Sequence, residues 1–187
     1  MAETVKEKIG AVNAKDSKLV LAHMIFVIIA LAIGGTAGLI QVLERSGYFE
    51  LPSWISYYQV LTLHGVVLAL VLTTFFIMGF QFAAISRVCG GLTNTERKIG
   101  WVGFFMYATA TVVAAIMILL NEATVLYTFY APLQAHVIYY IALAVLVVGT
   151  WVSATAQLMG YFRWKRQHKG QKSPLLSYMV AINNVMW

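Results

Sequence analysis

The chain has 187 residues, of which 60% are hydrophobic and 11% charged, and its formal net charge is +6. A mean hydropathy of +0.77 is untypical of a soluble globular domain and predicts an integral membrane protein. The single cysteine excludes a disulfide framework and a Cys-rich metal or iron–sulfur site within the chain, and the lack of a CxxCH motif excludes covalent heme attachment.

The apolar segments predict an all-α membrane protein, an antiparallel bundle of transmembrane helices with four full spans and a truncated fifth. A polar arm, residues 1–18, comes first and lacks the apolar core and cleavage site of a signal peptide. Residues 19–187 are expected to form the transmembrane portion. Its spans are expected at about 19–43, 54–85, 99–120, 133–162 and, incomplete, 175–187, where the chain stops within a helix as a fragment of a longer polypeptide would.

The first span contains two features that could matter for packing. His23 lies near its start, where we expect it at the membrane interface, because deeply placed polar side chains are costly. Gly34, Gly35 and Gly38 form a small-residue face that favours close contact with a neighbouring helix.

Lysine and arginine are concentrated in residues 1–18, 87–98 and 163–172, which hold twelve of the thirteen cations. The two intervening connections carry only Arg45, so the basic segments are expected on one side of the membrane. The positive-inside rule then places the amino terminus in the cytoplasm. The basic charge is therefore interpreted as a topology signal, and no nucleic-acid partner is expected.

The second span carries one imidazole, His64, in an apolar run with no charged residue before Arg87. Neutral imidazole is a standard axial ligand of heme iron. A membrane histidine can equally hydrogen-bond a neighbouring helix, so a ligand and a structural histidine remain open on chemistry alone. Gly65 favours the ligand slightly, because its missing side chain would leave room for a flat macrocycle.

His64 follows Trp54 by ten residues, or about 15 Å of helix, which places it in the outer part of the membrane. A cofactor at this depth would exchange electrons with a donor on the outer side. Within the chain only His136 could supply a second axial ligand, and we expect it at the interface instead. Glu122 is expected to be a solvated residue at a helix end.

Four stretches resemble subunit I of the heme–copper oxygen reductases. YYQVLTLHGVVLALVLTTFF (57–76) resembles the second helix of that subunit. NEATVLYTFYAPLQAH (121–136) and TWVS (150–153) are similar to its B-type branch, and PLLSYM (174–179) to the start of its fifth helix. The resemblance covers residues 19–187 and implies the amino-terminal portion of a prokaryotic cell-membrane oxidase that reduces oxygen to water and translocates protons.

The resemblance also implies a site. His64 matches the axial ligand of the low-spin heme b, with Tyr57, Tyr58 and Gln59 near its propionates, Gly65 beside it and Tyr127 in a stretch packed toward the oxygen-reducing site. The other low-spin ligand, and the ligands of the high-spin heme and copper, belong to later helices. The implied partners are those helices, a subunit II with the electron-entry copper, cytochrome c or quinol, and membrane lipid. By itself the chain is expected to be inactive.

Two other functions remain open. The large subunit of nitric oxide reductase shares the second-helix histidine and the overall fold, and its distinguishing acidic residues would lie beyond Trp187. A non-catalytic membrane b-heme electron carrier is the alternative from a different class. A transporter is disfavoured because no span has a Pro-broken midpoint or paired half-helices.

Overall fold

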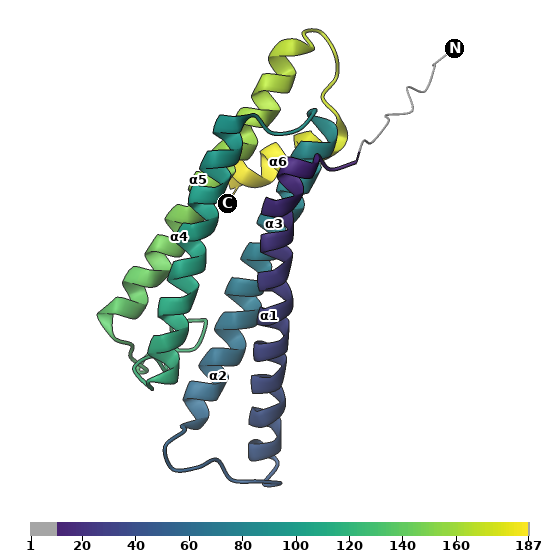
Figure 1. Cartoon of the computed structure of the whole chain (residues 1–187). Coiled ribbons are helices and arrows are strands. Elements are labelled where there is room, and N and C mark those ends of the chain that lie inside the picture. The colour runs from purple at the N-terminus through teal and green to yellow at the C-terminus, as the bar shows by residue number, and fades with distance from the viewer. Residues whose placement is uncertain (1–10, 187) are drawn as a thin grey trace.

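The structure is a computed structural model that describes residues 11–186, and Figure 1 shows its helices. They are α1 (Ala14–Arg45), α2 (Tyr57–Gly65), the π-helix η1 (Val66–Leu72), α3 (Thr73–Val88), α4 (Asn94–Leu119), α5 (Val137–Gln167) and α6 (Leu175–Met186). Because α2, η1 and α3 are continuous, four helices are long and apolar enough to cross a membrane, and α6 is shorter. The predicted all-helical membrane protein with four full spans and a short fifth helix is confirmed.

The helix ends differ from the predicted span limits because polar caps lie outside the apolar runs. The first helix begins at Ala14, not near residue 19, because the Asn13 side chain accepts a hydrogen bond from the Lys15 amide. The second begins at Tyr57 after a capping box formed by Ser56 and Gln59. Residues 14–18 of the predicted arm are therefore helical, and residues 1–10 lie outside the described residues.

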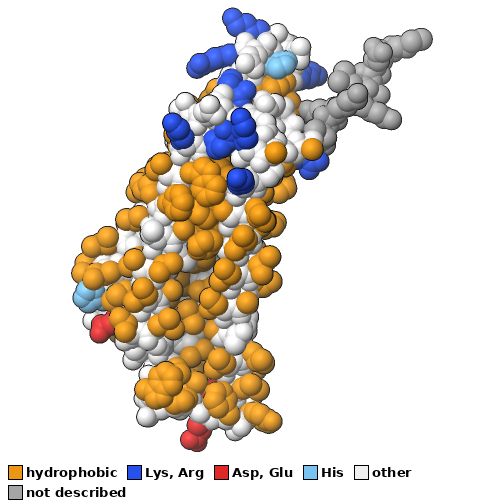
Figure 2. All heavy atoms as spheres, in the orientation of Figure 1, with side chains coloured by type: hydrophobic (Ala, Val, Ile, Leu, Met, Phe, Trp, Pro, Cys, Tyr) orange, Lys and Arg blue, Asp and Glu red, His pale blue; other side chains and the backbone are white. Residues whose placement is uncertain are grey.

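The helices associate as two pairs (Figure 1). One pair is α1 with the α2–η1–α3 rod, and the other is α4 with α5. Small residues bring α4 and α5 together, since a Cβ on Gly103 would lie 2.8 Å from the Gly149 carbonyl oxygen. The pairs meet where α3 contacts α5 and where α1 and α2 contact α4, and α6 packs against α3 and α5. Figure 2 shows lysine and arginine gathered at one end of the molecule and a largely hydrophobic surface below them.

Two ion pairs connect the helices at this basic end. The Arg97 Nε donates to the Asp16 carboxylate at 2.8 Å, and the Arg163 Nε donates to Glu96 at 3.0 Å. Both carboxylates are buried. The basic segment 87–98, expected to connect two spans, contains the first turn of α4. Its Glu96 and Arg97 join α4 to α5 and α1 through these ion pairs.

His23, which was expected near the membrane interface, is fully buried between the helices. Its Nδ1–H donates to the Leu19 carbonyl oxygen at 2.7 Å, which leaves Nε2 to accept from the Tyr107 hydroxyl. Ser153 of α5 hydrogen-bonds the same hydroxyl at 3.5 Å. The close approach of α3 at Gly79, where a Cβ would lie 2.7 Å from the His23 Cβ, seals the imidazole inside the bundle.

Candidate functional site around His64

His64 lies in the last turn of α2, half-buried against α1. Its Nδ1 is 2.8 Å from the carbonyl oxygen of Gly34. A carbonyl oxygen can only accept, so Nδ1 carries the proton and, in the neutral ring, Nε2 carries the lone pair. Among residues 11–186, Nε2 has no hydrogen-bond partner. In this state the imidazole could bind a metal through Nε2, with a backbone carbonyl orienting the ring from behind.

Glycines of α1 make the space for this imidazole. A Cβ on Gly38 would lie 2.7 Å from both Cε1 and Nδ1 of His64. A Cβ on Gly34 would lie 2.6 Å from the Leu68 Cγ, whereas one on Gly35 would meet nothing within 4 Å. Gly34 and Gly38 therefore form the predicted close helix contact, and Gly35 does not take part in it.

The helix changes its winding directly after the site. Val66–Leu72 forms a π-helix, in which backbone hydrogen bonds run from residue i to i+5. Such segments often occur at functional sites, because the wider turn shifts the phase of the side chains that follow. The sequence VVLALVL has no proline or glycine that would have predicted it.

Three polar side chains, spaced by three residues from the N-cap of α2 onward, bind the end of α4 and the connection that follows it. The Ser56 hydroxyl donates to the Asn121 side-chain oxygen at 2.8 Å, and the Gln59 Nε2 donates to the Leu119 carbonyl at 2.8 Å. Finally, the Thr62 hydroxyl oxygen accepts from the backbone N–H of residue 126 at 3.1 Å. Sequence analysis did not predict these three hydrogen bonds. The available signal was the polar side chains at positions 56, 59 and 62, a spacing that places them on one face of a helix.

The same connection places Tyr127 on the helix beside His64. A Cβ on Gly65 would lie 2.8 Å from the Tyr127 Cδ1, so the phenol ring fills the space that the glycine leaves. The room expected there for a macrocycle is thus occupied by Tyr127. Consecutive helical residues point about 100° apart, so the ring lies on the face next to that of the imidazole.

The remaining predicted site residues lie in the first turn of α2. The rings of Tyr57 and Tyr58 meet edge to face at 5.8 Å between centroids, and Tyr58 is half exposed. Gln59 is buried, and its side chain is engaged with the Ser56 backbone N–H at 3.2 Å as well as with α4. The tyrosines remain accessible, whereas Gln59 has a structural role as a link between α2 and α4.

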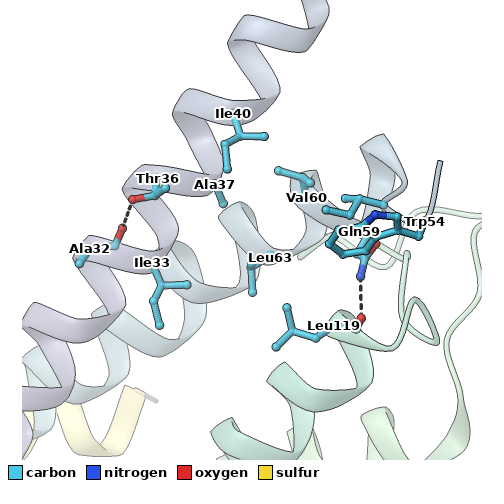
Figure 3. A pocket seen from close by; sticks show the side chains of 11 residues that line it. Ala32, Ile33, Thr36, Ala37, Ile40, Trp54, Gln59, Val60, Leu63 and Leu119 are labelled. Atoms are coloured by element: carbon cyan, nitrogen blue, oxygen red, sulfur yellow. Dashed lines mark hydrogen bonds between the residues drawn. The ribbon is translucent and has the colours of Figure 1, made fainter. Parts of the chain in front are cut away.

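A cavity of about 490 Å³ lies between α1, α2 and the end of α4 (Figure 3). Its walls are mostly aliphatic, and neither His64 nor Gly34 lines it. Its polar side chains are Gln59, which bonds the Leu119 carbonyl, Thr36, which bonds the Ala32 carbonyl at 2.8 Å, and the indole of the exposed Trp54. None of these side chains is a usual metal ligand or acid–base group, so the candidate site is on the His64 side of α2.

The other histidines are engaged elsewhere. His136 is exposed and caps α5, where its Nδ1 accepts from the Ile138 amide at 3.2 Å. His168 stacks on Trp164 at 4.3 Å between ring centroids. Within residues 11–186, no three His, Cys, Asp or Glu side chains cluster in a way that could hold a metal ion. An iron at His64 would need its remaining ligands from another source, as a porphyrin provides.

The chain is similar in sequence and in fold to known membrane oxidases. The chain is 36% identical over 181 residues to cytochrome c oxidase subunit 1 of Thermus thermophilus, and the match covers 92% of this chain and 32% of the relative. Its fold matches a cryo-EM structure of a heme–copper terminal oxidase dimer with a TM-score of 0.85 at 36% identity, over 94% of this chain and 30% of the other. The chain thus spans about a third of the length of these proteins. Residues 18–187 also match the family model for cytochrome c and quinol oxidase polypeptide I, and the chain belongs to that family.

Proposed function

We propose that the chain is part of the catalytic subunit of a respiratory terminal oxidase, which reduces oxygen to water with electrons from cytochrome c and couples this to proton translocation. In it, His64 supplies one axial ligand of the low-spin heme b. The observation that carries the proposal is the His64 Nε2, which has no partner among residues 11–186 while Nδ1–H is held 2.8 Å from the Gly34 carbonyl. The relatives named above are oxidases, which favours oxygen over nitric oxide as the substrate.

The residues present fit a heme at this place. The carbonyl of Gly34 fixes the tautomer and raises the basicity of the ligating nitrogen, as partners behind metal-bound histidines do. Because Gly38 has no side chain, the His64 imidazole fits against α1 without a clash. When bound, the heme supplies one-electron transfer. Tyr57, Tyr58 and Gln59 are proposed near its propionates, and Tyr127 is proposed to belong to a stretch packed toward the oxygen-reducing site.

The orientation of the chain follows from its charge. The basic end of the bundle is proposed to face the cytoplasm of a prokaryotic cell, because lysine and arginine are retained on that side. Figure 2 shows this end. His64 would then lie toward the outer face, near an electron donor on that side. Proposed partners are the remaining helices of subunit I, a subunit II with the electron-entry copper, and cytochrome c or quinol.

The second heme ligand, the high-spin heme and the copper are proposed to depend on residues outside this third of the subunit. We accordingly expect residues 1–187 not to reduce oxygen by themselves. Oxygen consumption by a purified preparation of these residues, with bound copper, would contradict this expectation.

The proposal is tested in the complete oxidase with His64→Leu and, as a matched control, His136→Leu. Reduced-minus-oxidised spectra report the six-coordinate low-spin heme. We expect that signal to be lost in the first variant and retained in the second, because His136 only caps α5. An unchanged low-spin signal in His64→Leu would refute the assignment.

A further inference from the structure

One face of α5 forms a hollow at the basic end of the bundle, remote from His64. Residues 159, 162, 163, 166 and 167 follow the helical repeat, so their side chains share one face. Together with Glu96 of α4 they line a cavity of about 550 Å³. Its lower wall is apolar, because it is formed by Met159 and Phe162. The side chains of these residues are 38% and 51% exposed, so a ligand can reach them. Arg163, Arg166 and Gln167 stand above this wall, toward the end of the helix.

The charges of this hollow do not cancel. Glu96 is neutralised by Arg163, whose Nε and Nη2 donate to the two carboxylate oxygens at 3.0 and 3.2 Å. Arg163 also donates to the Gly91 carbonyl oxygen at 2.6 Å, which fixes the guanidinium. Arg166 is exposed and makes no hydrogen bond or ion pair with any residue between 11 and 186. One fixed ion pair and one uncompensated guanidinium therefore border the hollow.

We propose that this hollow binds an anionic phospholipid of the leaflet at the basic end. The guanidinium of Arg166 receives the headgroup phosphate, for which its planar set of donors is well suited. The first part of an acyl chain lies on the apolar side chains of Met159 and Phe162, which line the hollow beside Arg166. Basic pockets beside transmembrane helices favour acidic headgroups in this way. The arrangement of apolar wall and unpaired cation, rather than the general basic charge, is what assigns the site.

The test uses the complete oxidase in lipid nanodiscs with spin-labelled phosphatidylglycerol and phosphatidylcholine, and measures the ratio of their affinities for the protein. Arg166→Gln removes the proposed headgroup contact. Lys169→Gln removes the same charge from the exposed turn after α5, outside the hollow. We expect the first variant to lower the preference for phosphatidylglycerol about fivefold, and the second by less than about twofold, because exposed charges act weakly through screening salt.

Equal losses in both variants would overturn the proposal, since they would show a diffuse effect of basic charge. An unchanged preference in Arg166→Gln would also overturn it. Inorganic phosphate added to the wild-type protein should not displace the labelled lipid, and displacement would show a phosphate site instead. The unfolding temperature should be the same in both variants, because neither side chain has a hydrogen-bond or ion-pair partner among residues 11–186.

Discussion

Gly38→Ala tests the space that α1 provides for the His64 imidazole. The new methyl carbon would lie 2.7 Å from Cε1 and Nδ1 of the ring. Non-bonded carbon atoms prefer separations of about 3.5–4.0 Å, so either the imidazole or α1 must move by about 1 Å. The ring can yield only by disturbing its 2.8 Å hydrogen bond to the Gly34 carbonyl, on the same helix as the new methyl group.

The expected effect has a structural and a functional part. Overpacking of this kind costs about 1–3 kcal/mol of folding stability. Loss of the group that orients a metal-bound histidine lowers metal affinity by about 10–100-fold. The affinity for heme in Gly38→Ala should therefore decrease by about this factor. The helix itself is not weakened, because alanine is a better helix former than glycine.

Gly35→Ala is the matched control, because it makes the same chemical change in the same turn and its Cβ meets nothing within 4 Å. Both variants are prepared in the complete oxidase. The heme content per polypeptide, the low-spin optical spectrum and the midpoint potential of the low-spin heme are then measured. The reasoning is refuted if Gly38→Ala matches Gly35→Ala in all three measurements.

Two further substitutions and one labelling experiment test other contacts of the bundle. Thr62→Val should leave the amide of Leu126 unpaired at a cost of about 1–3 kcal/mol and speed its hydrogen exchange, whereas Thr62→Ser should not; identical exchange in the two variants would argue against the contact. Tyr107→Phe leaves the buried His23 Nε2 without a donor and should lower thermal stability by about 1–3 kcal/mol in detergent, an account that an unchanged melting temperature would rule out. Burial raises the pKa of the Cys89 thiol to about 11, so at pH 8 roughly one thiol in a thousand is ionised. Maleimide should therefore label the folded protein much more slowly than the denatured chain and accelerate as pH rises toward that pKa; equal rates in the two states would show an accessible thiolate.

The number and type of helices could be predicted from the sequence because their cause is local. An apolar run long enough to cross the hydrocarbon layer has to satisfy its backbone groups within itself, so it forms a helix wherever it occurs. The limits were less accurate, since α1 begins at Ala14 and α4 at Asn94 through polar caps outside the apolar runs. The π-helical segment Val66–Leu72 was not predicted, because its residues are ordinary membrane-helix residues.

His64 could be selected from the sequence by local reasoning as well, because a polar ring within an apolar run is rare and chemically capable. Sequence alone could not tell a ligand from a structural histidine. The structure adds the contact with Gly34, 30 residues earlier, whose carbonyl holds Nδ1–H and leaves Nε2 without a partner in the described part of the chain. His23 is a second case, since its position near the end of a span did not indicate that Tyr107, 84 residues away, hydrogen-bonds its ring inside the bundle.

The sequence by itself therefore determined the membrane class, the four spans and which histidine is the candidate heme ligand, since each follows from the chemistry of neighbouring residues. Only the tertiary structure decided which nitrogen of His64 is free, that Gly38 makes room for the ring and that Tyr127 fills the space at Gly65. These depend on which helices approach each other and at which residues. Such contacts join positions far apart in the chain, so local patterns do not record them.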